Sequence, residues 1–294
     1  MAQQFGFIGV PSSAGAKTPG IEKAPEAIRA AGLINQLQGC VVDYGDLSRE
    51  RYASDPGHPR ALNLPRVITV ARRVAKQVEE VLQSDQIPLV IGGDCSITVG
   101  VVAACTQNQP DLRLIYIDGG LDLYTPETNL EGNLDSMGVA HMLAEPGTDT
   151  TLSHLGARFP LLTPQQVIYF GYEALPPDDP EQIALVKYGM RHFPASVVRG
   201  RAQAAAQELL AEMGPYPFLV HFDVDVIDFN DFAIADVPLF GQGLKFTEAM
   251  SGLAVFASNP HFAGLVITEI NPDHMDEQHT EAHIFVRELV RALT

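Results

Sequence analysis

Acidic side chains follow four short apolar runs of this chain, at the points where the runs end. The segments are Asp118 to Asp122 after 112–117, Asp223 to Asp225 after 218–222, Glu269 after 266–268, and Gly92-Gly93-Asp94-Cys95 after 88–91. One aspartate after a strand is often only a cap or a turn former. Five carboxylates gathered in a low dielectric repel one another unless a cation lies between them. The pattern predicts a metal-centred site for hard ions such as Mn²⁺ or Mg²⁺.

The elements that must position these residues alternate along the chain. The expected strands are mostly continuous apolar runs, as in parallel strands buried on both faces. They cover 5–10, 40–44, 88–91, 112–117, 167–170, 218–222 and 264–268. Helical spacing is clearest at 67–83, 202–213, 246–257 and 280–293. The order predicts an α/β fold with one doubly wound, mostly parallel sheet and helices on both faces. No linker interrupts it, so we expect a single domain over 1–294. Ligands of such sheets bind at the carboxyl ends of the strands.

Composition limits the classes of partner. The 19 basic and 36 acidic residues give a formal charge of −17, the wrong sign for nucleic acid or an anionic membrane. The charge favours a cationic substrate, although it also serves solubility alone. No apolar run is long enough to span a bilayer and no signal peptide is evident, so a cytoplasmic protein is expected. The three cysteines, Cys40, Cys95 and Cys105, fit a reducing compartment.

The four chemical segments also carry a family resemblance. In sequence order they read Gly92-Gly93-Asp94-Cys95, Asp118-Gly-Gly-Leu-Asp122, Asp223-Val-Asp225 and Glu269-Ile-Asn-Pro272. They resemble the ureohydrolase family of arginases and agmatinases, whose segments read Gly-Gly-Asp-His, Asp-x-His-x-Asp and Asp-x-Asp, with a glutamate before Asn-Pro. The resemblance implies an arginase-like three-layer fold, two manganese ions, hydrolysis of a guanidino compound to urea and an amine, and a homo-oligomer.

The chain departs from the family pattern at three histidine positions, which are occupied by Cys95, Gly120 and Asp135. The resemblance assigns Asp118 and Asp223 to bridging both ions and Asp122 with Cys95 to the first ion. It leaves Asp225 in a second site without its nitrogen ligand. One or two Mn²⁺ ions are therefore expected. A thiolate favours softer ions such as Zn²⁺ or Fe²⁺, so another divalent metal stays open, as does a purely structural role for Cys95.

The resemblance also assigns catalytic roles, with the metal ions activating water for attack on the guanidinium carbon. Glu269 matches the residue that pairs with the guanidinium, and Asp225 would orient the nucleophile and assist proton transfer. Asp135 stands where the family often has a proton-shuttling histidine, and an unperturbed carboxylate would shuttle poorly at neutral pH. His141, on an expected helix over 137–143, is a candidate replacement, with packing as its alternative role. His221, near the third segment, matches no family ligand and is given no role.

The expected function is metal-dependent hydrolysis of a guanidino group. The loop 122–132 carries Tyr124, Asn129 and Glu131 where arginases have small polar residues. This difference favours another guanidino compound, or an arginine side chain within a peptide that would become ornithine. The acidic residues Asp178, Asp179 and Glu181 would line the same mouth or solvate a proline-rich loop.

Two alternatives stay open. The first is a pseudoenzyme that keeps the fold and serves as a binding or regulatory subunit, which the three lost histidines favour. The second is a metal-dependent deacetylase, although the histidine pair that it requires is not evident in the sequence.

Overall fold

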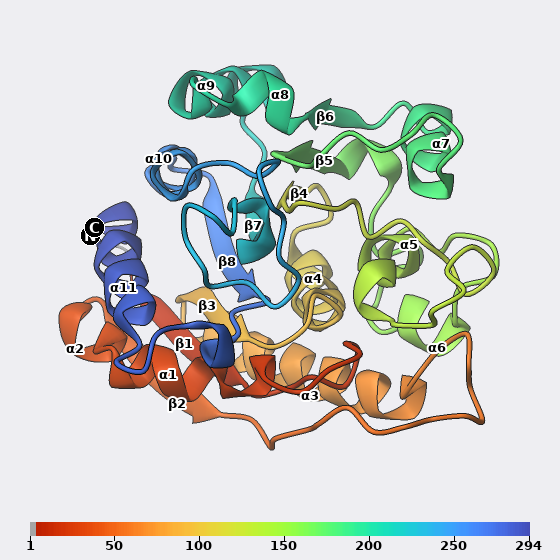
Figure 1. Cartoon of the computed structure of the whole chain (residues 1–294), viewed down its shortest axis with the longest axis horizontal. Coiled ribbons are helices and arrows are strands. Elements are labelled where there is room, and N and C mark those ends of the chain that lie inside the picture. Colours follow the sequence, from red (N-terminus) through yellow and green to blue (C-terminus); the bar gives the residue numbers. More distant parts are fainter. Residues whose placement is uncertain (1–3) are drawn as a thin grey trace.

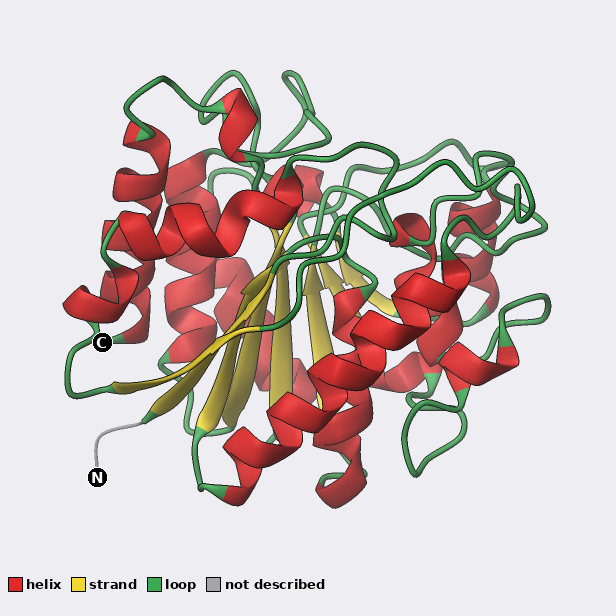
Figure 2. Cartoon of the chain, turned by 90° about the horizontal axis from the view of Figure 1, so that it is seen from below, coloured by secondary structure: helices red, strands yellow, loops and turns green. Residues whose placement is uncertain are grey.

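The protein, described here by a computed structural model for residues 4–294, is built on one sheet that lies between layers of helices (Figure 2). The eight strands pair in the order β2-β1-β3-β8-β7-β4-β5-β6, and every pairing is parallel. The strands are β1 (Phe5–Val10), β2 (Val41–Asp46), β3 (Ile87–Gly92), β4 (Arg113–Ile117), β5 (Val167–Phe170), β6 (Arg191–Phe193), β7 (Phe218–Asp223) and β8 (Phe262–Thr268). The predicted fold class is confirmed.

Helices cover both faces of the sheet (Figure 1). The α-helices are α1 (Ala24–Ala30), α2 (Leu33–Gln36), α3 (Leu64–Gln83), α4 (Ile97–Asn108), α5 (Gly138–Met142), α6 (Thr150–Ser153), α7 (Pro180–Lys187), α8 (Ala195–Val198), α9 (Ala202–Met213), α10 (Phe246–Ala257) and α11 (Thr280–Leu293). Short 3₁₀ turns are η1 (Ile21–Lys23), η2 (Asp135–Met137), η3 (Pro164–Gln166), η4 (Val224–Val226) and η5 (Pro272–His274). Among the described helices, none is both long enough and apolar enough to cross a bilayer.

The hydrophobic core lies on both sides of the sheet. One cluster packs the side chains of α1, α9, α10 and α11 against the sheet, and the other packs those of α3, α4 and α5. Helices α3 and α4 approach each other closely at Gly100, where a Cβ would lie 2.4 Å from the carbonyl oxygen of Ala71. Helix α4 is buried almost all round, so its sequence lacks the one-sided periodicity by which α3 and α11 could be recognised.

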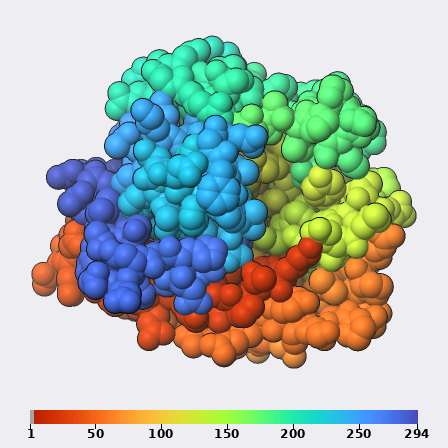
Figure 3. Space-filling view, viewed as in Figure 1, coloured from red at the N-terminus to blue at the C-terminus, as the bar shows by residue number. Residues whose placement is uncertain are grey.

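The sheet order brings the four chemical segments together. They follow β3, β8, β7 and β4, which are four consecutive strands in the centre of the sheet. Because these strands are parallel, their carboxyl ends meet at one edge. The space-filling view shows a hollow between the N-terminal loop 11–20, the segment 119–137 and the segment 227–245 (Figure 3). The fold therefore gathers residues from four distant stretches of sequence.

Candidate metal centre

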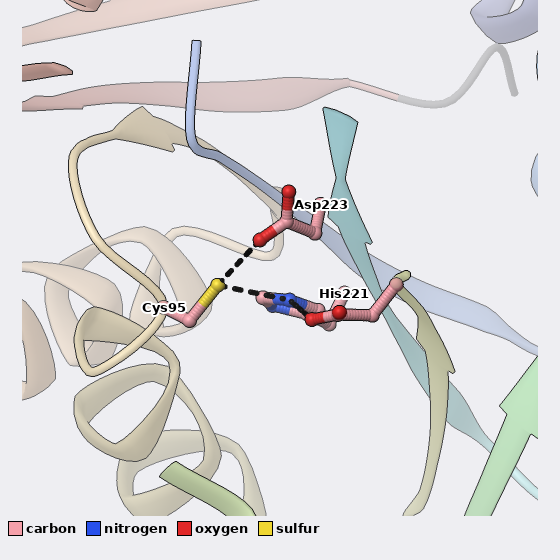
Figure 4. Close-up of side chains that lie close together, drawn as sticks. Cys95, His221 and Asp223 are labelled. Carbon is pink, nitrogen blue, oxygen red and sulfur yellow. Dashed lines mark hydrogen bonds and ion pairs between the residues drawn. The ribbon is translucent and has the colours of Figure 1, made fainter. Parts of the chain in front are cut away.

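Strand β7 supplies two side chains to the centre. Successive side chains of a strand alternate between faces, so His221 and Asp223 point to the same side. The Cys95 thiol donates a hydrogen bond of 2.7 Å to Asp223 Oδ2 and lies 3.6 Å from His221 Nε2 (Figure 4). The other oxygen of Asp223 accepts from the backbone N–H of Asp225 at 2.7 Å. The side chains of Cys95, His221 and Asp223 are all buried.

His221 is held on several sides. Its Nδ1 lies 2.9 Å from Thr98 Oγ1, and its ring stacks on Tyr116 with centroids 3.9 Å apart and planes inclined by 7°. Its Nε2 lies 3.5 Å from Asp118 Oδ2. Burial lowers the pKa of His221 to about 3, so the ring is neutral near pH 7. Sequence reasoning gave this residue no role. Its spacing of two residues from Asp223, within a buried strand, was the available signal.

The segment after β4 presents Asp118 and Asp122 differently. Asp118 Oδ1 accepts from the N–H of Gly120, whereas its buried Oδ2 has no hydrogen-bond partner. Asp122 accepts a hydrogen bond from the Tyr116 hydroxyl. It also has a φ of 51°, a strained conformation for a residue with a side chain. One oxygen of Asp118 thus lies near His221 without a hydrogen bond, whereas Asp122 is hydrogen-bonded to the Tyr116 hydroxyl.

Glu269 and Asp135 form a second group with Cys95. One ligand atom from each of these three residues lies within 4.8 Å of the others. Both oxygens of Glu269 are buried without a hydrogen bond, and its φ of 62° is again strained. Asp135 Oδ1 accepts from the Cys95 N–H at 2.6 Å. Burial, followed by the charge of Asp94, raises the pKa of Asp135 well above its ordinary value, so the assumption of an unperturbed carboxylate is wrong for this residue.

Asp225 lies at the edge of the centre and is partly exposed. Its Oδ1 accepts from the Gly119 N–H at 2.9 Å. Burial, and then the charge of Asp118, raises the pKa of Asp225 to about 7, which is the range suited to proton transfer near neutral pH. The two groups of mutually close ligand atoms contain neither Asp225 nor Asp122.

Asp94 holds the loop before α4 in place through hydrogen bonds. This buried carboxylate accepts from the N–H of Gly15 at 3.0 Å and from the hydroxyl of Ser96. Gly93 permits a close crossing with the N-terminal loop, because a Cβ there would lie 1.5 Å from the carbonyl oxygen of Ser12. Asp94 and Gly93 therefore fix the position of Cys95 beside the end of β7.

His141 lies outside both groups of ligand atoms. It is fully buried in α5, which together with η2 replaces the single helix expected over 137–143. Its Nδ1 lies 2.8 Å from the carbonyl oxygen of Met137, and its Nε2 accepts from the N–H of Asp149 at 3.2 Å. These two bonds favour the packing alternative. The shuttle role stays a prediction without a contact to support it.

Two acidic residues at the start of α7, Asp179 and Glu181, make contacts within the protein, whereas Asp178 is exposed. Glu181 neither lines a mouth nor solvates a loop, because it is buried and accepts from the N–H of Leu123 at 2.7 Å. Asp179 caps α7 and accepts from the Tyr124 hydroxyl at 3.0 Å. Together these bonds hold the start of the segment that follows Asp122.

Comparisons with known proteins show the family to which this sequence and fold belong. The model of the Arginase family matches residues 3–293. The chain belongs to the arginase family. It is 29% identical to human arginase-1 over 279 residues, which is 92% of this chain and 86% of the relative, and 30% identical to rabbit (Oryctolagus cuniculus) arginase-1 with the same coverage. The crystal structure of arginase from Bacillus cereus covers 99% of this chain and 98% of its own, with a TM-score of 0.89 and 27% identity.

The donor set fits the two-manganese centre of arginases only in part. Asp118 and Asp223 offer carboxylates to one ion beside Cys95, and the orphaned Asp118 oxygen requires a partner. In the arginase family a histidine occupies the position of Gly120, where this chain has no side chain at all. A Cβ at Gly120 would meet only Asp118 Oδ1, at 3.4 Å, so the space beside it is open. The residues present fit one ion well and a second ion poorly.

Proposed function

We propose that the protein is a metal-dependent hydrolase that cleaves a guanidino group into urea and an amine. The observation that supports this proposal is Glu269, a buried carboxylate with two unpartnered oxygens beside the metal centre. A buried carboxylate without partners is costly, and a planar guanidinium satisfies both oxygens at once. Among the ion pairs of residues 4–294, none joins Glu269, Asp118 or Asp223 to a lysine or arginine. A substrate cation and a metal ion would supply the missing positive charge.

The residues of the chain divide the remaining tasks. A bound divalent ion supplies Lewis acidity to the reaction. Asp225 is the carboxylate best placed to hold a proton when water attacks the guanidinium carbon, because it is partly exposed and is oriented by the Gly119 N–H. Asp135 holds the backbone of Cys95 in place through its 2.6 Å hydrogen bond. Burial of Glu269 excludes water from the carboxylate that would orient the guanidinium.

The substrate is proposed to be an arginine side chain, within a peptide, that is converted to ornithine. Three side chains of the loop 122–132 already have partners within the protein. Tyr124 donates to Asp179, Asn129 donates to Asn133 and Ser136, and Glu131 pairs with Lys17. They have little capacity left for the amino and carboxylate groups of a free amino acid, so the guanidino group would dominate recognition. Family resemblance supports the expected homo-oligomer, whereas the cysteine content of the chain supports a reducing, cytoplasmic location.

The test is release of urea from arginine, agmatine and an arginine-containing peptide, with Mn²⁺ or Zn²⁺ added separately. We expect the peptide to be the best substrate. Glu269→Gln should lower kcat/KM by about 100-fold or more, because an ionic hydrogen-bonded pair is lost. Glu208→Gln removes an equivalent charge from the exposed surface and is the matched control. Failure of all three substrates with either metal would exclude the hydrolase.

The pseudoenzyme alternative is supported by the direct bond between Cys95 and Asp223, two candidate ligands that satisfy each other. It predicts tight binding of an arginine peptide without turnover. Equilibrium binding of the same peptide, measured beside the urea assay, separates the two functions.

A further inference from the structure

We propose that this chain binds a single ion through Cys95, His221, Asp118 and Asp223, and that the site selects zinc-like ions over manganese. The nitrogen ligand comes from strand β7 instead of the loop after β4. The inference deepens the proposed function, on which it rests for any catalytic use of the ion. Binding of the ion itself is argued independently from the contacts of these four side chains.

Two of the separations around His221 match a tetrahedral site. Zinc bonds of about 2.0–2.3 Å to nitrogen, oxygen and sulfur place neighbouring ligand atoms roughly 3.3–3.7 Å apart. The Cys95 Sγ to His221 Nε2 distance is 3.6 Å, and the His221 Nε2 to Asp118 Oδ2 distance is 3.5 Å. All four ligand atoms lie within 4.8 Å of one another. The Cys95 Sγ to Asp223 Oδ2 distance of 2.7 Å is shorter than this range, so these two atoms must move apart when an ion replaces the thiol proton.

The surroundings orient His221 as a ligand. A ligating histidine usually donates its second ring N–H to a fixed acceptor. Here Thr98 Oγ1 lies 2.9 Å from Nδ1, and with Nδ1 as the donor the lone pair of Nε2 faces Cys95 Sγ at 3.6 Å, while Thr268 Oγ1 and Asp118 Oδ2 each lie 3.5 Å away. Stacking on Tyr116 fixes the plane of the ring. An ion would therefore meet an imidazole that is already aligned.

The unsatisfied group of the cluster is Asp118 Oδ2. This atom is buried, its residue is 2% exposed, and it has no hydrogen-bond partner. His221 is completely buried beside it. A buried carboxylate oxygen without a partner is rare in folded proteins, and an ion is one of the few groups that satisfies it.

The ligand types set the preference between ions. One thiolate, one imidazole and two carboxylates form a tetrahedral set that suits Zn²⁺, Co²⁺ or Fe²⁺, whereas Mn²⁺ favours oxygen-rich octahedral sites. The second group of close ligand atoms shares Cys95 with the first and adds only Asp135 and Glu269, so a second ion would have to compete for the same thiolate, and Gly120 offers it no nitrogen ligand. One zinc-like ion per chain is the expected stoichiometry.

The first experiment measures metal content and affinity. Full-length protein stripped by a chelator is titrated with Zn²⁺, Mn²⁺ and Co²⁺ separately, and bound metal is counted by mass spectrometry. We expect one Zn²⁺ per chain, bound more tightly than Mn²⁺. The Co²⁺ form should show the intense near-ultraviolet absorption of a cobalt–thiolate bond, which is lost in Cys95→Ser.

The ligand role of His221 is tested by His221→Gln, with His141→Gln as the control for removing a buried histidine and Cys105→Ser as the control for a buried thiol. We expect a loss of Zn²⁺ affinity only in the first variant. If His221→Gln does not fold, Thr98→Val removes the partner of Nδ1 and should weaken Zn²⁺ binding by about 10- to 100-fold.

Three results would overturn the inference. They are two Mn²⁺ per chain bound more tightly than Zn²⁺, Zn²⁺ affinity unchanged in both His221→Gln and Thr98→Val, and no metal bound under any loading. Each concerns binding and is independent of urea. Zinc bound as described without urea release would refute the proposed function alone, whereas urea release that depends on two Mn²⁺ would refute this inference alone.

Discussion

The buried Glu181 should make the metal-free protein less stable as the pH rises. Burial raises the pKa of Glu181 from 4.5 to about 8, although the Leu123 N–H opposes this effect. The folded state therefore binds this proton more tightly than the unfolded chain. The resulting stabilisation is fully present below pH 4.5 and is lost as the pH approaches about 8. At about 1.4 kcal/mol per pH unit, the total is at most about 5 kcal/mol.

The variant Glu181→Gln keeps an oxygen for the Leu123 N–H and removes the titration. Its free energy of unfolding, measured by urea denaturation with chelator present, should equal that of the native protein near pH 5. It should exceed the native value by about 2–4 kcal/mol at pH 8. Glu208→Gln, a substitution at an exposed position, controls for the lost charge. Parallel curves for the native protein and Glu181→Gln between pH 5 and 8 would refute the reasoning.

Four further outcomes are expected. Gly93→Ala should lower the free energy of unfolding by at least about 4 kcal/mol, seen as a lower Tm, because its Cβ would collide with the Ser12 carbonyl. The space beside Gly120 is open, so Gly120→Ala should change the free energy of unfolding by less than about 1 kcal/mol. Gly120→His should raise Mn²⁺ affinity by about tenfold or more in the same titration, and an unchanged affinity would show that the missing nitrogen is not what limits binding. Saturating Zn²⁺ at 100 times its Kd should stabilise the protein by about 2.7 kcal/mol, and chelation should reverse this gain in a thermal scan.

The sheet was predictable because its six inner strands are almost completely buried. Seven of the eight strands appear in the sequence as bounded apolar runs, and β1 and β5 have the expected limits. β6 was missed because its three residues include Arg191 and His192, which are exposed at the sheet edge. α4 was missed for the opposite reason, since its residues from Ile97 to Thr106 are all buried and give no helical period.

The sequence predicted which strand ends carry the site residues, but not how their side chains pair. The carboxyl ends of β3, β8, β7 and β4 meet as the pattern indicated, but sequence spacing could not specify which oxygen of each carboxylate is satisfied locally. Cys95 reaches Asp135 across 40 residues, and Leu123 reaches Glu181 across 58 residues. Such pairings arise from packing between distant segments, so no local motif encodes them.

The position of His221 explains how the family site could lose its loop histidines and still retain a nitrogen ligand. Gly120 lies beside Asp118 Oδ1, whereas His221 approaches Oδ2 of the same carboxylate from the strand side. A ligand on a central strand, stacked on Tyr116 and bonded to Thr98, has fewer accessible orientations than one on a loop. A histidine at position 120 would approach Asp118 Oδ1, whereas His221 approaches Oδ2, so the two nitrogens would not compete for one oxygen. Gly120→His would therefore add a ligand to the centre, and its effect on Mn²⁺ should persist when His221 is also replaced.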